Sequence, residues 1–177
     1  MLKTETVLCE RDSENRVVIN MNVNDDTDFL SVFSHNSDPI ISEGVADFIE
    51  NSANSVHPKE RLTLRIHSNC IDENEKIIYD RAIRNYYAEK NIANNINFRR
   101  NNIIMLILLM LGVAVLAFSM FLSSNIKNEV WPEVVDIIAW VLVWEAADIG
   151  IFKNSELRIK RKRYKAFTDM KIEYLAV

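Results

Sequence analysis

A long uncharged stretch stands out in the second half of the sequence. No charged residue lies between Arg100 and Lys127, and residues 103–123 are almost entirely apolar. About 20 apolar residues in a helix cover the roughly 30 Å of hydrocarbon in a bilayer. The pattern therefore predicts a membrane span over residues 103–123. A buried helix of a water-soluble protein is the alternative, but so long an apolar run is less typical of one.

A second apolar stretch covers residues 131–152. It contains four acids, namely Glu133, Asp136, Glu145 and Asp148. Its ten Leu, Ile, Val and Phe residues favour insertion by about 0.3 to 0.6 kcal/mol each, whereas an acid costs about 2.5 to 3.5 kcal/mol at the helix centre and less near its ends. Only Glu145 lies near the middle, and the link to the first span is short. The sequence thus predicts a full crossing rather than an interfacial helix, and the two spans form a hairpin.

Alternating apolar and polar residues before residue 100 predict strands. Val17 to Val23 alternates and could pair with Thr6 to Cys9 as a β-hairpin across a turn-rich link. Leu62, Leu64 and Ile66 alternate with polar residues and predict a half-buried strand. A weaker alternation from Lys171 to Val177 indicates a terminal strand that joins the same sheet.

Two helices are predicted among these strands. Asp38 and Pro39 resemble an N-cap followed by proline in the first turn, with apolar residues at helical spacing up to about Asn54. Asp72, with Glu75 three residues later, indicates a capping box for an amphipathic helix. That helix either continues through the asparagine-rich residues 91–97 or ends there at a hinge.

These elements predict an α+β cytoplasmic domain, with a small sheet and two helices, joined to an α-helical transmembrane hairpin. The predicted division is residues 1–100 for the cytoplasmic domain, 101–152 for the hairpin, and 153–177 for a basic cytoplasmic tail helix with a terminal strand. Charge supports this division, since residues 1–80 carry seven Lys and Arg against sixteen Asp and Glu, whereas residues 153–177 carry eight against three. Basic residues flank both spans, so the positive-inside rule predicts a protein of the cell membrane with both termini cytoplasmic.

Residues that carry chemistry are sparse. The three histidines have no spacing typical of a metal site, and only three glycines are present, too few for a phosphate-cradling loop. His67 beside Arg61 and Arg65 could bind an anion, but a solvated sheet face is the more common role of such residues. Cys9 and Cys70 stand far apart outside any metal motif and are predicted to be buried small hydrophobes. We therefore expect no catalytic residues, metal or cofactor, and no enzyme.

The segment after the second apolar stretch is strongly basic. Six of the eight residues from Arg158 to Lys165 are Lys or Arg. A position next to a membrane span predicts contact with anionic lipid headgroups rather than with nucleic acid. The residues expected to make this contact are Arg158, Lys160, Arg161, Lys162, Arg163 and Lys165.

One resemblance extends over about residues 76–175. The run AWVLVWEAAD at residues 139–148, followed by the basic LRIKRKRY at residues 157–164, resembles a group of uncharacterised small prokaryotic membrane proteins. Those proteins have a cytoplasmic domain before a two-helix hairpin. The resemblance implies the same architecture here and no particular activity.

Two functions are consistent with these predictions. In the first, the hairpin anchors a cytoplasmic interaction or sensing module, whose partner the sequence does not identify, at the membrane. In the second, the chain is a subunit of a homo-oligomer that conducts ions or protons, with Glu145 and Asp148 as intramembrane functional residues. The anchor is favoured because two helices alone cannot enclose a pore.

Overall fold

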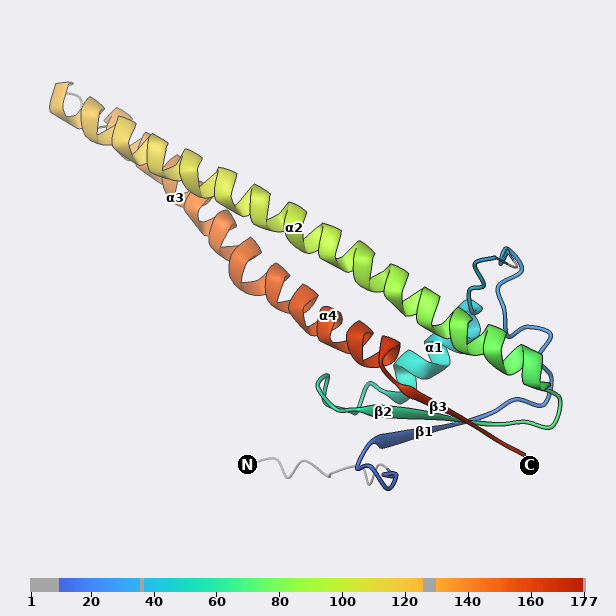
Figure 1. Ribbon diagram of the computed structural model, residues 1–177. Coiled ribbons are helices and arrows are strands. Elements are labelled where there is room, and N and C mark those ends of the chain that lie inside the picture. The colour runs from blue at the N-terminus through green and yellow to red at the C-terminus, as the bar shows by residue number, and fades with distance from the viewer. Residues whose placement is uncertain (1–9, 36, 126–129, 177) are drawn as a thin grey trace. The chain divides into compact units, whose positions relative to one another are not determined.

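The computed structural model describes residues 10–35, 37–125 and 130–176 (Figure 1). The chain divides into two compact units. Unit 1 comprises Met1–Ile92 and Lys160–Val177, and unit 2 comprises Ala93–Ile159. The chain therefore leaves unit 1 once and returns to it, so that both terminal parts of the sequence belong to the same unit.

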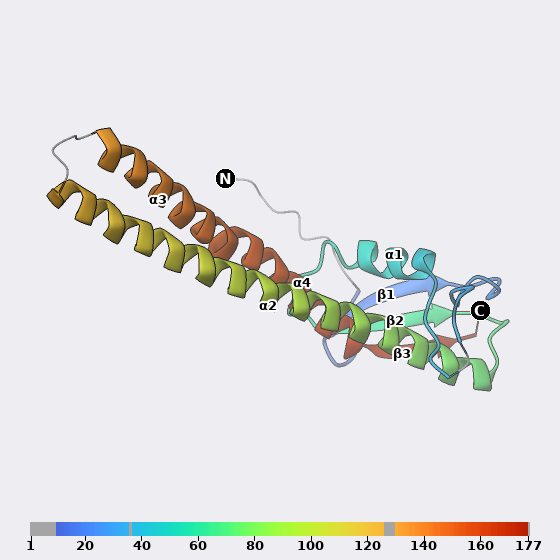
Figure 2. The ribbon, with the colours of Figure 1, turned by 90° about the horizontal axis from the view of Figure 1, so that it is seen from above.

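Unit 1 contains a three-stranded parallel sheet with the order β1-β2-β3 (Figure 2). The strands are β1 (Val17–Asn22), β2 (Leu62–His67) and β3 (Lys171–Leu175). All three predicted strand positions are confirmed. Thr6 to Cys9, the predicted hairpin partner of β1, lie outside the described residues. Parallel neighbours require crossover connections, and the crossover from β2 to β3 contains the whole of unit 2.

Helix α1 (Glu43–Ser52) forms the crossover between β1 and β2. The predicted N-cap at Asp38 is wrong, because Ser42 caps the helix by accepting a hydrogen bond from the Val45 N–H. Asp38 instead accepts a hydrogen bond from the side chain of Asn85 at 2.8 Å. A proline in the first turn of a helix and a proline in an extended turn cannot be distinguished in the sequence. The hydrogen bond between Asp38 and Asn85 is a long-range contact that no local pattern predicts.

Helix α2 (Glu73–Asn125) begins in unit 1 with the predicted capping box. Asp72 Oδ1 accepts from the Glu75 N–H at 2.7 Å, and Glu75 Oε2 accepts from the Asp72 N–H at 2.7 Å. These reciprocal bonds satisfy N–H groups that a helix start leaves without intrahelical partners. The asparagine-rich stretch does not form a hinge, because the helix continues through it.

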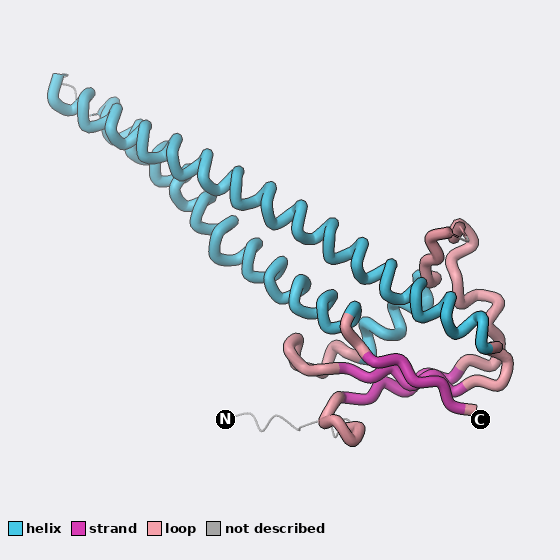
Figure 3. Tube along the Cα trace, viewed as in Figure 1, coloured by secondary structure: helices cyan, strands magenta, loops and turns pink. Residues whose placement is uncertain are grey.

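The core of unit 1 lies between the sheet and the parts of three helices that cover one of its faces (Figure 3). Leu64 and Ile66 of β2 are fully buried, as is Ile49 of α1. Helix α4 (Asn154–Thr168) adds Phe167, whose ring lies 4.7 Å from that of Tyr87 on α2. These contacts hold the end of α4, and hence β3, in unit 1. Cys70 is exposed in the loop after β2, so its predicted burial is wrong.

Unit 2 contains the remainder of α2, helix α3 (Val130–Asp148), the π-helical turn η1 (Ile149–Lys153) and the first residues of α4. Helices α2 and α3 approach each other closely at Gly112. A Cβ atom added there would lie 2.8 Å from Val143 Cγ2 and 3.5 Å from the Ala139 carbonyl oxygen. The absence of a side chain at Gly112 therefore permits this packing.

The predicted fold class, a cytoplasmic domain joined to a two-helix transmembrane hairpin, is wrong in its second part. Residues 103–123 are not a separate helix but part of α2, which runs for 53 residues. Among the described residues, Glu73–Ser124 is the one helix that is long and apolar enough to cross a membrane. The physical reason is charge, because the 19 residues of α3 contain Glu133, Asp136, Glu145 and Asp148.

Candidate lipid-facing surface and anion-binding cavity

The apolar stretch of α2 leaves most of its surface uncovered. Only 11% of its most apolar 18-residue segment is buried against the rest of the protein. Met110 is 65% exposed and Val113 is 54% exposed. The large apolar side chains exposed along this stretch are Ile103, Ile104, Leu106, Ile107, Leu109, Met110, Leu111, Val113, Phe118, Met120 and Phe121. A continuous apolar surface of this extent marks a contact with lipid or with another protein.

Asparagines connect α2 to the beginning of α4 within unit 2. The side chain of Asn94 donates to the Leu157 carbonyl oxygen at 2.9 Å, and Asn154 donates to Asn102 Oδ1 at 2.7 Å. Asn94 and Asn154 are both buried. Buried amides need such partners because an unsatisfied polar group costs about 1 to 3 kcal/mol. The asparagine-rich stretch therefore has a packing role rather than a role as a hinge.

The two acids proposed from sequence as intramembrane functional residues share one lysine. Lys153 Nζ lies 3.1 Å from Glu145 Oε1 and 3.2 Å from Asp148 Oδ2. The sequence analysis missed this partner, although the order Glu145, Asp148, Lys153 on consecutive helical turns was a signal for it. A carboxylate with a lysine counter-ion is suited to a structural ion pair.

The six basic residues expected at lipid headgroups have different surroundings. In unit 2, the Arg158 guanidinium lies over the Phe98 ring, 5.7 Å from its centre. In unit 1, Arg163 donates to Asn54 Oδ1 at 2.7 Å and to the Val56 carbonyl oxygen at 3.2 Å. Lys162 and Lys165 line a cavity, whereas Lys160 and Arg161 are exposed beside it in sequence. The predicted set is therefore not a uniform basic face.

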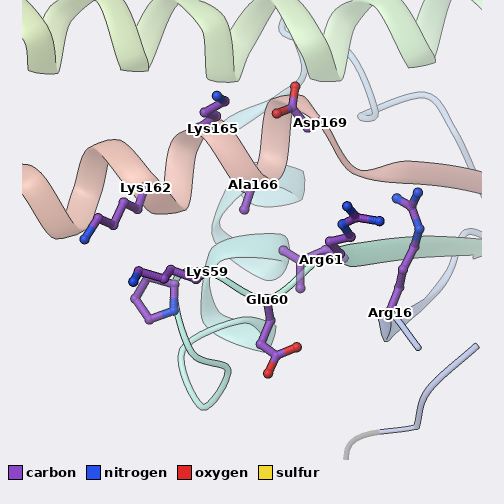
Figure 4. A pocket seen from close by; sticks show the side chains of 10 residues that line it. Arg16, Lys59, Glu60, Arg61, Lys162, Lys165, Ala166 and Asp169 are labelled. Atoms are coloured by element: carbon purple, nitrogen blue, oxygen red, sulfur yellow. The ribbon is translucent and has the colours of Figure 1, made fainter. Parts of the chain in front are cut away.

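This cavity has a volume of about 550 Å³ and lies entirely within unit 1. It is lined by Arg16, by residues 58–62 before and at the start of β2, by three residues of α4, namely Lys162, Lys165 and Ala166, and by Asp169 just after that helix. In Figure 4, Lys162 extends toward Lys59, and Arg61 extends toward Arg16. In the same view, the side chains of Lys165 and Asp169 point in a different direction from that of Ala166.

Some of the charges at this cavity are neutralised by neighbours. Arg16 Nε contacts Glu14 Oε2 at 3.0 Å, and hydrogen bonds from Arg16 and then Lys171 hold the pKa of Glu14 below its ordinary value. Glu60 Oε2 contacts Arg11 at 3.2 Å. In the part of the chain that the structure describes, Lys59, Arg61 and Lys162 have no ion-pair partner. The cavity therefore has a net positive charge.

The polar face of the sheet provides a contrast. Arg65 contacts Glu10 at 2.8 Å and Glu173 at 3.3 Å. Hydrogen bonds from Asn20 and then from Arg65 hold the pKa of Glu10 below its ordinary value. His67 Nε2 lies 3.1 Å from Asn20 Oδ1. The predicted solvated sheet face therefore consists of ion pairs and hydrogen bonds, and Arg61, which was grouped with Arg65, lines the cavity instead.

Sequence reasoning identified two of the cavity's cations, Lys162 and Lys165, and assigned them to headgroups. It missed Lys59 and the role of Arg61, because about a hundred residues separate them from α4. The local signal was a Pro-Lys-Glu-Arg turn at residues 58–61 just before a buried strand. That signal does not indicate which helix packs above the turn.

No family model, curated protein or solved structure matches this chain. The resemblance to small prokaryotic membrane proteins thus stays a prediction.

Proposed function

We propose that this protein is a membrane-anchored module, in which the apolar stretch of α2 inserts into a bilayer and holds unit 1 at the cytoplasmic surface. The observation that carries the proposal is the exposed apolar surface of α2. Unit 1 is then an interaction or sensing domain. Its acidic N-terminal part and basic cavity offer surfaces of opposite charge to partners.

The exposed side chains of α2 are more stable in lipid than in water. A large apolar side chain that moves from water to an apolar environment gains about 1.5 to 3 kcal/mol. In water, this free energy is not gained by the exposed apolar side chains of α2, such as Met110 and Val113. Monomeric soluble proteins rarely expose continuous apolar surface on this scale. Insertion into lipid removes the cost along the whole stretch.

The connectivity of unit 1 supports one orientation. Strands β2 and β3 are neighbours in the same sheet, although unit 2 lies between them in the chain. This pairing supports a location of the residues before unit 2 and those after it on the same side of a bilayer. Arg99, Arg100 and the basic α4 are near the two ends of unit 2 in the sequence. The positive-inside rule assigns that side to the cytoplasm.

Membrane fractionation with alkaline carbonate tests the anchor. The full chain is expected in the pellet, whereas Met110→Arg with Val113→Arg is expected in the supernatant, since each arginine costs about 2.5 to 3.5 kcal/mol near a helix centre. The matched control is Ile77→Arg with Ile92→Arg, which changes exposed apolar residues of the same helix within unit 1. Extraction of the unaltered chain, or retention of the Met110 and Val113 variant, would contradict the anchor.

The orientation has its own test. In a chain with Cys9→Ser and Cys70→Ser, single cysteines at Ser13 and Ala176 should resist a membrane-impermeant maleimide in intact cells. Both should react after the cells are permeabilised. Reaction of either position in intact cells would overturn the cytoplasmic assignment, and reaction of only one would show that the two ends lie on opposite sides.

A further inference from the structure

We propose that the cavity between the start of β2 and α4 in unit 1 binds a ligand with at least two phosphate charges, through Lys59, Arg61 and Lys162. This inference goes beyond membrane anchoring and does not depend on it. The shared chemistry is a diphosphate or a phosphomonoester, which either a soluble metabolite or a lipid headgroup can supply.

Three cations of this cavity have no counter-charge among the described residues. Lys59, Arg61 and Lys162 line one cavity without an ion-pair partner among the described residues. Two acids line the same cavity, namely Glu60, which contacts Arg11 at 3.2 Å, and Asp169, which makes no ion pair with these three cations. Like charges that share a cavity repel each other, and this cost is removed when an anion lies between them.

The rest of unit 1 provides a contrast. The chain has 25 acids and 21 Lys and Arg residues, so acids to pair with these cations are not scarce. On the sheet face, Arg65 has two carboxylate partners, and Lys171 has Glu14 at 3.4 Å and Glu173 at 3.0 Å. Arg65 and Lys171 thus each have two carboxylate partners. The cavity cations differ from them in a way that a bound anion explains.

The cavity walls are rigid. Buried Phe167 fixes α4 against Tyr87, and Arg163 ties the same helix to Asn54 and to the Val56 carbonyl oxygen. Leu62, at the opposite wall, is buried in β2. The cationic side chains therefore project from backbone that is already held in place, which lowers the entropic cost of binding.

Size and donor chemistry indicate the ligand class. A cavity of about 550 Å³ falls within the range of about 300 to 1,000 Å³ typical of small-molecule sites. An arginine guanidinium donates two parallel hydrogen bonds to phosphate oxygens, and lysines add mobile point charges. Pro58, Leu62 and Ala166 provide apolar wall for the organic part of the ligand. A single monovalent anion would leave most of the positive charge unneutralised.

The test measures binding of inorganic pyrophosphate to the full chain in neutral detergent by isothermal titration calorimetry. Arg61→Gln with Lys162→Gln should weaken binding at least about tenfold, because a hydrogen bond to a charged group contributes about as much as a factor of ten in affinity. The matched control is Arg81→Gln with Arg161→Gln, which removes the same charge from exposed positions that do not line the cavity. The control should bind like the unaltered chain.

A second arm identifies the source of the phosphate. Native mass spectrometry should detect bound phosphatidic acid, and not phosphatidylcholine, if a headgroup enters the cavity, and pyrophosphate should then displace it. Binding of pyrophosphate with no retention of phosphatidic acid assigns the site to a soluble ligand. No binding of either probe, or an equal loss in the cavity and control variants, would overturn the proposal. Unfolding midpoints of all variants show whether each remains folded.

Discussion

Truncation of Phe167 tests how firmly the C-terminal segment is held in unit 1. Phe167 is fully buried, and its ring packs 4.7 Å from the ring of Tyr87. Phe167→Ala empties on the order of 100 Å³, and a residual cavity costs about 24 cal/mol per Å³, or about 2.4 kcal/mol. The lost transfer energy brings the expected total to about 3 to 5 kcal/mol. That is a large fraction of the 5 to 15 kcal/mol by which domains are typically stable.

Hydrogen exchange resolves where this loss falls. Phe167 is the next-to-last residue of α4 and lies four residues before the start of β3, so its removal should release β3 from β2. A loss of 3 kcal/mol or more lowers protection factors by about a hundredfold or more when exchange requires that opening. Peptides that cover residues 171–175 should therefore exchange far faster in Phe167→Ala than in the unaltered chain.

The control is Phe48→Ala, which removes the same side chain from α1, where it is 43% exposed. Because this side chain is only about half buried, its removal loses about half of the transfer free energy of a phenylalanine, and we expect the free energy of unfolding to fall by about 1 kcal/mol. Unchanged protection of β3 in Phe167→Ala, or the same change in both variants, would refute the reasoning. In that case the C-terminal strand would be held by its backbone hydrogen bonds and not by the helix that precedes it.

Two further predictions concern close packing and acid stability. Gly112→Leu should destabilise the packing of α2 on α3 by about 1 to 3 kcal/mol, because a Cβ atom at this position would already lie 2.8 Å from Val143 Cγ2. Thermal unfolding followed by tryptophan fluorescence measures this loss of stability. The control is Gly44→Ala, which should not lower the unfolding midpoint because the space around Gly44 is open. The backbone N–H of Arg16 holds the pKa of Asp12 below its ordinary 3.8. Asp12 therefore adds stability above about pH 4 that is lost as the pH falls through its folded pKa, and Asp12→Asn should flatten that part of a pH titration of the unfolding midpoint; an unchanged profile would contradict the assignment.

Local features of this protein were readable from the sequence alone. The capping box of Asp72 and Glu75, the alternation of Leu62 to His67 and the apolar run of residues 103–123 each depend on neighbours within a few positions. Short-range patterns of this kind reflect hydrogen bonds and burial that the local chain itself dictates. For the same reason the sequence indicated the strand at Lys171 to Leu175.

Only the tertiary structure decided which distant segments meet. Parallel pairing placed β3 beside β2, and this brought the cations of α4 over the turn that contains Lys59 and Arg61. The structure also shows that Asp38 accepts a hydrogen bond from Asn85, whereas Ser42 caps the helix. Of the two alternatives that the sequence left open for residues 91–97, the structure shows a continuous helix, in which Asn94 donates to the Leu157 carbonyl oxygen of α4. Contacts between segments about a hundred residues apart depend on the packing of the whole unit. A periodic pattern of apolar residues along the chain therefore does not predict them.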